Sequence, residues 1–404
     1  MNICVLTHTF PRNKQDVSAA FMKEFADGLV QAGSKVTVVT PYDPEFKRSD
    51  DIFKIVTYKY VWPKCLHLLG YSRSMKSDLS LRWISFLLAL LMFVFGTIAL
   101  YKTVKKEKID LINAHWILPN GLMALCVSKL TNVPYVITLP GTDVSIAYRY
   151  KILGLLAKII ARYSMGLISN SRYLLNRILT LGVSDIPTAI IPYPVDADKY
   201  FPSQRGVIDL RMKLGLNKND SIILAVGRLV DKKGFKYLIE AMPEIIKKHP
   251  NVKLILGGEG NLLQSLVKLA KDLRLGRKVI FTGTIKRDEI AVYYNLADVM
   301  AAPSIVDKNG NLDGGPVVCF ESMACGKPQV VTDILGVAEF IKNGVNGYVV
   351  PEKNSKLLAV AVNKILDSPS LAVTMGENNR KLVMFEFTTQ DIGKKYLDFI
   401  NNHV

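Results

Sequence analysis

Short apolar runs rich in β-branched residues alternate with longer segments of helical periodicity along the whole chain. The runs have the length of buried strands, and glycine, proline or polar turn residues bound them. Such an alternation is typical of a parallel sheet whose two faces are covered by helices. In the first half of the chain the predicted strands are 3–7, 36–40, 111–114, 135–139, 167–169 and 189–192.

A second series of strands begins after a break at residues 192–202, which are rich in proline and lack helical periodicity. The strands predicted after this break are 222–226, 253–256, 279–281, 299–301, 330–332 and 348–350. A chain of 404 residues is also longer than one core of ordinary size requires. We therefore expect two doubly wound, Rossmann-like α/β domains, at 1–195 and 196–385, and a C-terminal helix at 386–404 that can return to the first domain.

One apolar segment, residues 84–100, contains 17 residues without a charge. That is just short of the roughly 20 residues that cross a bilayer as a helix. A crossing would also separate strands 36–40 and 111–114, which one sheet must hold together. Two alternatives remain open: a helix buried in the first domain, or a helix lying in the membrane interface. Basic residues on both sides suit contact with acidic headgroups: Arg73, Lys76, Arg82, Lys102, Lys105, Lys106 and Lys108.

The formal net charge of +17 indicates anionic partners, which can be phosphorylated ligands, acidic membrane surfaces or nucleic acid. The sequence contains no interleaved basic and aromatic motif, so we expect no nucleic-acid partner. The five cysteines have no CxxC spacing, which argues against a zinc site and a disulfide framework. The N-terminus enters an apolar strand directly and lacks the regions of a signal peptide, so we expect a cytoplasmic protein.

A basic loop follows the predicted strand 222–226. Gly227 and Arg228 come directly after the strand, Lys233 follows, and Gly234 opens a segment whose apolar positions share one helical face. Arg228 and Lys233 are therefore expected on a loop that leads into a helix N-terminus. Backbone N–H groups and two cations there would stabilise the charge that grows on a diphosphate leaving group. The alternative is a solvated basic turn, and a second motif favours the functional interpretation.

That second motif contains two carboxylates, Asp313 and Glu321, eight positions apart around a predicted helix start. Gly315 and Pro316 suit the first turn of this helix, and a later glycine and proline suit its end. Glu321 then lies within about two turns of the helix N-terminus, where its carboxylate can accept two hydrogen bonds from a vicinal diol such as ribose. Asp313, in the glycine-flanked loop before the helix, is placed for the hydroxyls of a sugar ring.

Two further motifs are given no function. Asp196 and Asp198 have the DxD spacing of metal-dependent transferases of another fold, but they lie in the proline-rich break and suit a turn. The glycine-rich run 257–260 resembles a phosphate-binding loop only loosely, because neither GxGxxG nor GxxxxGK[ST] surrounds it. We therefore expect neither a metal site nor a dehydrogenase or P-loop enzyme.

With these motifs, the sequence resembles the retaining nucleotide-sugar glycosyltransferases of family 4, which have the GT-B fold of two Rossmann-like domains facing each other across a cleft. The resemblance covers essentially the whole chain and is strongest over 222–351. It implies transfer of a sugar with retained configuration, without a metal or another cofactor. It also implies donor contacts from Gly227, Arg228, Lys233, Gly283, Asp313, Gly315, Glu321 and Glu339.

The resemblance assigns a role to most of these residues. Arg228 and Lys233 would bind the donor diphosphate, and Asp313 would bind the transferred sugar. Glu321 would bind the ribose hydroxyls. Glu339 matches a further acidic position of the family near the donor, and the loop containing Gly283 resembles the family's loop beside the nucleobase.

The first half of the chain departs from the family's pattern. The loop after the first strand, 10–20, lacks the glycine pair that lets backbone approach the diphosphate in many members. Pro140 stands where the family commonly has a histidine, whereas Asp143 is retained. His115, beside Trp116, resembles the family's acceptor-side histidine, although a structural role is equally compatible with it. The resemblance leaves His115 and Asp143 as candidates for orienting the acceptor hydroxyl.

The motifs and the resemblance together predict a retaining, metal-independent hexosyltransferase of polysaccharide or glycolipid biosynthesis. Its donor would be a UDP- or GDP-sugar, and its acceptor a glycan or a lipid-linked molecule. The basic, apolar first domain predicts a peripheral position on an anionic membrane, at the inner face of the cell membrane. Two alternatives are a sugar-nucleotide epimerase of the same fold and a non-catalytic, glycosyltransferase-like subunit that binds a membrane or a partner.

Overall fold

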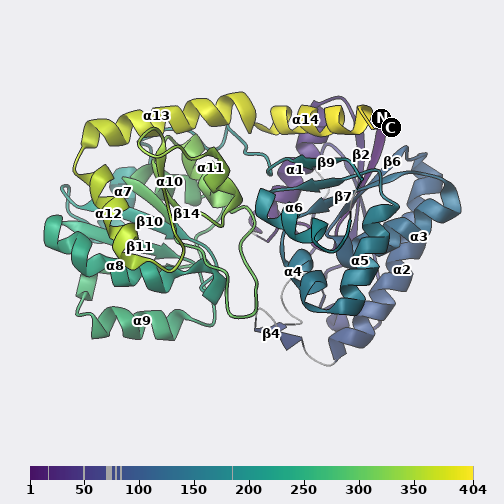
Figure 1. Cartoon of the computed structure of the whole chain (residues 1–404), viewed down its shortest axis with the longest axis horizontal. Helices are drawn as coiled ribbons and strands as arrows, with labels where there is room; N and C mark the ends of the chain where they lie inside the picture. Colours follow the sequence, from purple (N-terminus) through teal and green to yellow (C-terminus); the bar gives the residue numbers. More distant parts are fainter. Residues whose placement is uncertain are drawn as a thin grey trace. The chain divides into compact units, whose positions relative to one another are not determined.

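The computed structural model describes residues 1–16, 18–48, 51–69, 75–77, 80–81, 84–183 and 185–403. The chain forms two compact units, Met1–Pro194 with Thr389–Val404, and Val195–Thr388 (Figure 1). It leaves the first unit once and returns to it with the C-terminal helix, whereas the second unit is one continuous segment. Arg73 and Arg82, named above for contact with headgroups, lie outside the described residues, as does the side chain of Lys76.

The first unit contains a seven-stranded sheet in the order β3-β2-β1-β6-β7-β8-β9, with all neighbours parallel. Its strands are β1 (Asn2–Leu6), β2 (Lys35–Pro41), β3 (Lys54–Tyr58), β6 (Leu111–His115), β7 (Tyr135–Leu139), β8 (Leu167–Ser169) and β9 (Thr188–Ile190). The six predicted strands are present, and β3 is an addition. This edge strand was missed because it is only partly buried and lacks a continuous apolar run. A separate antiparallel pair comprises β4 (Met75–Ser77) and β5 (Ser80–Leu81).

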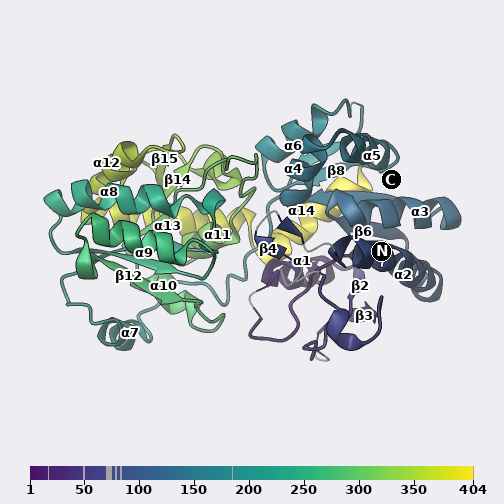
Figure 2. The same ribbon diagram turned by 90° about the horizontal axis from the view of Figure 1, so that it is seen from below.

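Helices cover both faces of this sheet (Figure 1, Figure 2). They are α1 (Ala20–Gln31), α2 (Ile84–Glu107), α3 (Leu122–Thr131), α4 (Thr142–Arg149), α5 (Lys151–Arg162), α6 (Arg172–Leu179) and α14 (Thr389–Asn401), with the turns η1 (Lys64–Leu66) and η2 (Ile117–Gly121). Side chains of strand β7 contact both helix layers, one on each face of the sheet. The Tyr135 hydroxyl donates to the carbonyl of Ile160 in α5 at 2.5 Å, whereas the Thr138 hydroxyl lies 3.2 Å from that of Tyr396 in α14. Helices α2 and α3 pack together on the α5 side, and α1 packs on α14.

Helix α2 carries the uncharged segment 84–100 and presents apolar side chains on two sides. Its buried side comprises Leu88, Met92, Leu100 and Val104. Its exposed side carries an apolar row at helical spacing, here named the α2 stripe: Leu87, Leu90, Val94, Ile98 and Tyr101. The part Leu87–Glu107 is long and apolar enough to cross a membrane by length and composition. It packs on β1, β2 and β3, however, so the segment combines a core face with an exposed apolar face.

The second unit contains a six-stranded parallel sheet in the order β12-β11-β10-β13-β14-β15. Its strands are β10 (Ser221–Val226), β11 (Val252–Gly257), β12 (Val279–Gly283), β13 (Val299–Ala302), β14 (Gln329–Thr332) and β15 (Gly347–Val350). All six were predicted, because central strands buried on both faces have continuous apolar runs. The helices are α7 (Val207–Lys213), α8 (Phe235–Lys248), α9 (Leu263–Asp272), α10 (Ile290–Leu296), α11 (Val317–Ala324), α12 (Ser355–Leu366) and α13 (Pro369–Glu386), with the turns η3 (Asp231–Lys233), η4 (Gly276–Lys278) and η5 (Gly336–Phe340).

The strand order reverses once in each sheet. The reversal lies between β1 and β6 in the first unit and between β10 and β13 in the second. At such a switch point the following loops diverge and leave an opening at the carboxyl ends of the strands, where doubly wound sheets bind their ligands. The loops after these four strands are therefore the places where functional side chains are expected.

Candidate functional site

The loop after β10 is held against the loop after β13 by a glycine. Gly234 ends η3 and precedes α8 with a φ of 65°, in the left-handed region. A Cβ atom at this position would lie 1.9 Å from the carbonyl oxygen of Pro303. Only glycine meets both conditions, so the residue permits the basic loop to reach the opening beside β13.

Lys233 and Asp313 meet at this opening. The Lys233 Nζ donates to the Asp313 Oδ2 at 2.5 Å, although the two residues are 80 positions apart. Both side chains keep some exposure, at 15% and 19%. Burial raises the pKa of Asp313, but the positive charges of Lys233, Lys232 and Arg228 outweigh it and lower the pKa below its ordinary value. The site therefore holds an ionised carboxylate beside accessible cations.

The cationic part of the site contains three side chains. Arg228 is exposed on the loop directly after β10, and Lys233 reaches Asp313. Lys232 had not been singled out, because a lysine in a charged run usually belongs to a solvated face. In the structure its side chain is buried and adds positive charge at Asp313. Such a cluster suits a polyanionic ligand.

Helix α11 begins and ends where its sequence predicted, and it carries Glu321 into the second unit's interior. The Tyr294 hydroxyl of α10 donates to the Glu321 Oε2 at 2.5 Å, and both side chains are buried. Burial raises the pKa of Tyr294 well above its ordinary value, and the Glu321 charge adds to this rise. The tyrosine therefore stays a donor and fixes the orientation of the carboxylate. Tyr294 was missed because a tyrosine in an apolar helix reads as core.

The remaining predicted donor residues lie on loops at the same edge of the sheet. The Gly336 amide donates to the carbonyl of Gly314 at 2.8 Å, which joins the start of η5 to the loop between Asp313 and Gly315. Glu339 is exposed on η5. Gly283 ends β12, and its carbonyl accepts the amide of Gly258 at 2.7 Å. Gly315, Gly283 and Glu339 thus follow strands β13, β12 and β14 at their carboxyl ends.

The two motifs that were given no function have structural roles. The amides of Asp198 and Lys199 donate to the Asp196 Oδ1 at 3.1 Å, which is a turn closed by its own side chain. In the glycine-rich run 257–260, the Glu259 carbonyl accepts the amide of Leu229 at 2.8 Å. This run therefore holds the basic loop in place through a backbone hydrogen bond.

In the first unit, His8 and Trp116 meet at the other switch point. His8 follows β1, Trp116 follows β6, and their ring centroids are 4.2 Å apart. Both side chains are partly exposed. Trp116 has a φ of 68°, which is strained for a bulky residue and is commonest at functional sites. His8 was missed because a histidine after a strand has no spacing signal of its own.

Asn120 connects this pair to His115. Its Nδ2 donates to the His115 carbonyl at 2.7 Å and lies 3.3 Å from the His8 Nδ1. Since the carbonyl requires a donor, the amide orientation follows, and the His8 Nδ1 is the acceptor. Burial lowers the pKa of His8 to about 4. His8 is therefore neutral near pH 7 and carries its proton on Nε2.

His115 and Asp143 lie behind this surface. The His115 side chain has no exposure, its Nδ1 contacts the Tyr193 hydroxyl at 3.0 Å, and burial lowers its pKa to about 3. The Asp143 Oδ2 accepts the amide of Ile117 at 2.6 Å, in the turn after Trp116. Burial raises the pKa of Asp143 to about 6, against the opposing effect of this hydrogen bond. Asp143 therefore holds the turn that follows Trp116, and the His115 side chain is buried against Tyr193.

Ion pairs of Arg12 hold the loop after β1, where many members of the family that this sequence resembles have a glycine pair. The Arg12 Nε lies 2.6 Å from the Asp16 Oδ2, and the Arg12 guanidinium also contacts Glu45 at 2.7 Å. Ala19, at the end of this loop, has a φ of 52°, a backbone conformation that glycine adopts more readily. Val17 of the same loop lies outside the described residues.

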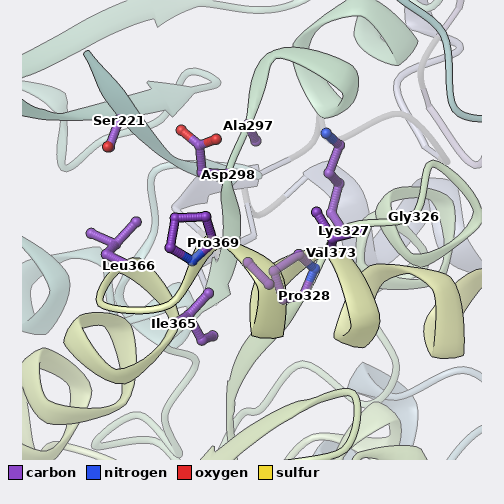
Figure 3. Close-up of a pocket in the computed structure, with 11 residues that line it drawn as sticks. Ser221, Ala297, Asp298, Gly326, Lys327, Pro328, Ile365, Leu366, Pro369 and Val373 are labelled. Carbon is purple, nitrogen blue, oxygen red and sulfur yellow. The ribbon is translucent and has the colours of Figure 1, made fainter. Parts of the chain in front are cut away.

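A cavity of about 230 Å³ lies at the opposite edge of the second unit's sheet (Figure 3). Ser221, Asp298 and Pro328 in its wall stand at the amino ends of β10, β13 and β14. The Asp298 carboxylate accepts the amide of Ile222 at 2.7 Å, and the Lys327 Nζ donates to the carbonyl of Asn295 at 2.9 Å. The charged groups of this cavity are thus engaged by the chain itself, and it contains none of the predicted site residues.

Two family models match the sequence. The model described as Glycosyltransferase Family 4 matches residues 18–199, and the model described as Glycosyl transferases group 1 matches residues 207–382. The first match extends from the first unit a few residues past Pro194, and the second lies within the second unit.

Similar proteins cover the full length or about half of the chain. An uncharacterized glycosyltransferase of Methanocaldococcus jannaschii is 27% identical over 98% of this chain and 96% of its own. A GDP-mannose-dependent alpha-(1-6)-phosphatidylinositol monomannoside mannosyltransferase of Mycolicibacterium smegmatis is 28% identical over 57% of this chain and 60% of its own. The structure of HepE from Anabaena in complex with UDP has a TM-score of 0.77 and 20% identity over 100% of both chains. The last similarity shows a shared fold.

Proposed function

Because this chain belongs to the family 4 glycosyltransferases and has their GT-B fold, we propose that it transfers a hexosyl unit from a UDP- or GDP-sugar to a glycan or lipid-linked acceptor. The contact of Lys233 with Asp313 at 2.5 Å, beside Arg228 and Lys232, carries this proposal. It combines cations for a diphosphate with a carboxylate for sugar hydroxyls at a switch point. The names of two similar proteins support the donor class, since one is GDP-mannose-dependent and the other was solved with UDP.

The donor residues would act on the two ends of the bond that breaks. Arg228 and Lys233 would bind the diphosphate and stabilise the negative charge that develops as it leaves. Asp313 would accept hydrogen bonds from the transferred sugar, and Glu321, oriented by Tyr294, would accept them from the ribose. Arg228 and Lys233 would supply the positive charge that a bound metal ion supplies in metal-dependent transferases. We therefore propose a metal-independent reaction.

The transfer would retain the configuration at C1. The bond from C1 to the phosphate oxygen breaks with its electron pair on the nucleoside diphosphate, and the acceptor oxygen bonds to C1 on the same face. The acceptor proton passes to the departing phosphate oxygen. In this scheme no protein base is required, which agrees with the complete burial of His115 and with its lowered pKa, since both make its imidazole a poor base.

We place the acceptor side at the switch point of the first unit. The His8 Nε2 carries a proton and can donate to an acceptor oxygen, while the Trp116 indole offers an apolar face for a sugar ring. Asp143 would then be a positioning residue, because its carboxylate holds the turn after Trp116. His115 contributes its backbone carbonyl, which orients Asn120.

The α2 stripe supports a peripheral position on the cytoplasmic face of a membrane. Its apolar residues are exposed on one side of a helix whose last turns carry Lys102, Lys105 and Lys106. A helix of this kind can lie in the interface with its lysines at the headgroups. A membrane position suits a lipid-linked acceptor.

The test is nucleoside diphosphate release from UDP-, GDP- and ADP-sugars, with and without a membrane lipid extract. We expect release with one donor, dependent on the extract, unchanged by EDTA and strongly reduced in Glu321→Ala. Glu244→Ala, an exposed glutamate on α8, is the matched control.

Three outcomes would contradict parts of the proposal. Conversion of the donor to another sugar nucleotide without an acceptor would favour an epimerase. Release that EDTA abolishes would remove the metal-independent scheme. A folded protein that binds a donor and releases nothing would favour a non-catalytic subunit.

A further inference from the structure

Helix α5 exposes an apolar row where a helix of a soluble domain normally has polar residues. Its members recur at helical spacing, and each exposes at least 40% of its surface. We name this row the α5 stripe; it comprises Ile152, Leu155 and Ile159 of the helix and Tyr163 directly after its last residue. The side of α5 that faces the unit carries three small residues, Gly154, Ala157 and Ala161, and the fully buried Ile160. Three large aliphatic side chains of the helix, those of the stripe, remain exposed.

The sequence segment that contains the stripe carries positive charge alone. Between residues 144 and 184 the sequence contains no Asp or Glu. The same segment contains Arg149, Lys151, Lys158, Arg162, Arg172 and Arg177. Two exposed tyrosine rings, Tyr163 of the stripe and Tyr148 of α4, lie beside cations. The Lys129 Nζ is 4.0 Å from the centroid of the Tyr163 ring, and the Arg177 guanidinium is 4.5 Å from that of Tyr148.

We propose that the α5 stripe binds the surface of an anionic membrane, with α5 lying in the plane of the interface. The aliphatic side chains would enter the boundary of the acyl chains, and the tyrosines and cations would lie among the headgroups. A lipid surface suits this pattern, because a segment that carries only positive charge and exposes apolar side chains complements acidic headgroups over an acyl layer.

The α2 stripe lies in the same helix layer. Helices α2, α3 and α5 cover one face of the first unit's sheet, opposite α1 and α14 (Figure 1). Both stripes are exposed on the solvent side of this layer. The inference rests on the proposed function for its purpose, since a lipid-linked acceptor must be reached at a membrane, but the lipid contact can be measured without transfer.

The experiment is flotation of the full chain with vesicles of phosphatidylcholine, with and without phosphatidylglycerol. The test variant is Ile152→Ser with Leu155→Ser, which changes exposed side chains and should leave the fold intact. The matched control is Ile208→Ser with Met212→Ser on α7 of the second unit, where the side chains are 70% and 68% exposed. A third variant, Leu90→Ser with Val94→Ser, tests the α2 stripe alone.

We expect wild type to bind anionic vesicles more tightly than neutral ones. The α5 variant should lose about tenfold or more in partitioning, the scale expected for two aliphatic side chains withdrawn from an apolar layer. The α7 control should bind like wild type. Lys151→Gln with Arg162→Gln should weaken binding to anionic vesicles by roughly fivefold per cation and leave neutral vesicles unaffected.

The contradicting outcomes are separable. Wild-type binding by the α5 variant would overturn the inference, and a loss confined to the α2 variant would leave the membrane position of the proposed function intact. A change from dimer to monomer in the α5 variant, measured by light scattering at equal vesicle binding, would identify the stripe as a protein interface. Nucleoside diphosphate release with a detergent-dispersed acceptor tests the transfer itself independently.

Discussion

The Lys233 ammonium and the Asp313 carboxylate form an ion pair in the structure. A donor would replace this contact with one between Lys233 and a phosphate oxygen, leaving Asp313 free to accept from sugar hydroxyls. The pair thus keeps a partly buried carboxylate ionised and holds the two proposed donor-binding groups in place. Preorganised charge of this kind is usually the largest contribution of an enzyme to transition-state stabilisation.

Lys233→Ala should therefore lower kcat by about 100- to 1,000-fold. The fold should persist, because the side chain lies on a turn between elements and its described hydrogen bonds and ion pairs join it only to the partly exposed Asp313. Initial rates with saturating donor measure the effect. Lys236→Ala, an exposed lysine three residues away, is the control. Normal turnover in a folded Lys233→Ala protein would remove the diphosphate role.

His8 supplies the next residue-level prediction. His8→Ala should raise KM for the acceptor about tenfold, the scale of one lost hydrogen bond to a polar ligand group, while hydrolysis of the donor alone stays unchanged. His8→Gln should restore much of the affinity, since its amide nitrogen can occupy the place of Nε2. Because the pKa of His8 is lowered to about 4, the effect should not vary between pH 6 and 8. Equal defects in His8→Ala and His8→Gln would indicate a structural role.

Asp143 makes the stability of the protein depend on pH in an unusual direction. Its pKa is raised from 3.8 to about 6 on folding, so the folded state binds a proton more tightly than the unfolded state. Stability from this group is full below pH 3.8 and is lost as the pH rises through 6, by up to about 3 kcal/mol. Asp143→Asn keeps an acceptor for Ile117 and should abolish this slope. Urea unfolding of both proteins at pH 4, 5, 6 and 7 measures it; equal slopes would contradict the assignment.

At the scale of elements, helices α1 and α14 approach each other at a pair of glycines. A Cβ atom on Gly393 would lie 2.0 Å from the carbonyl oxygen of Gly28. In an open helix, replacement of glycine by alanine stabilises by about 1 kcal/mol. At this contact the methyl group would force the helices apart.

Gly393→Ala should therefore destabilise the first unit by about 1–3 kcal/mol, opposite in sign to the helix-propensity effect. Thermal unfolding followed by circular dichroism measures the change. Lys394→Ala, exposed on the same helix, should shift stability by less than about 0.5 kcal/mol. Stabilisation by Gly393→Ala would show that the two helices are not tightly packed.

At the scale of the whole molecule, the two units differ in how the chain builds them. The second unit is one continuous segment, Val195–Thr388, with its own sheet and apolar core. The first unit needs α14, whose sequence lies beyond the second unit. The proposed donor residues are all in the second unit, and the proposed acceptor residues are all in the first.

A fragment comprising residues 195–388 should consequently fold, bind UDP or GDP, and transfer no sugar. Titration calorimetry of the fragment measures binding, with Lys233→Ala in the same fragment as the control. Folded fragment without affinity for any nucleoside diphosphate would show that the donor site needs groups from the first unit.

The strand series and the positions of the site loops follow from the sequence. Buried parallel strands require continuous apolar runs, so twelve strands were recognised, while the partly buried edge strand β3 was missed. Residues such as Arg228, Asp313 and Glu321 were predicted as site residues because they lie at local signals, a strand end or a helix start. These signals extend over a few residues, because strand burial and helix capping each depend on residues that are neighbours in the sequence.

Tertiary structure alone decided which side chains meet. Lys233 bonds Asp313 across 80 positions, Tyr294 orients Glu321, and Asn120 joins His8 to His115. It also decided that the outer sides of α2 and α5 remain apolar and exposed, where periodicity alone could not separate a core face from a membrane face. Such contacts depend on the strand order, because loops distant in the chain become neighbours only where the sheet's winding reverses.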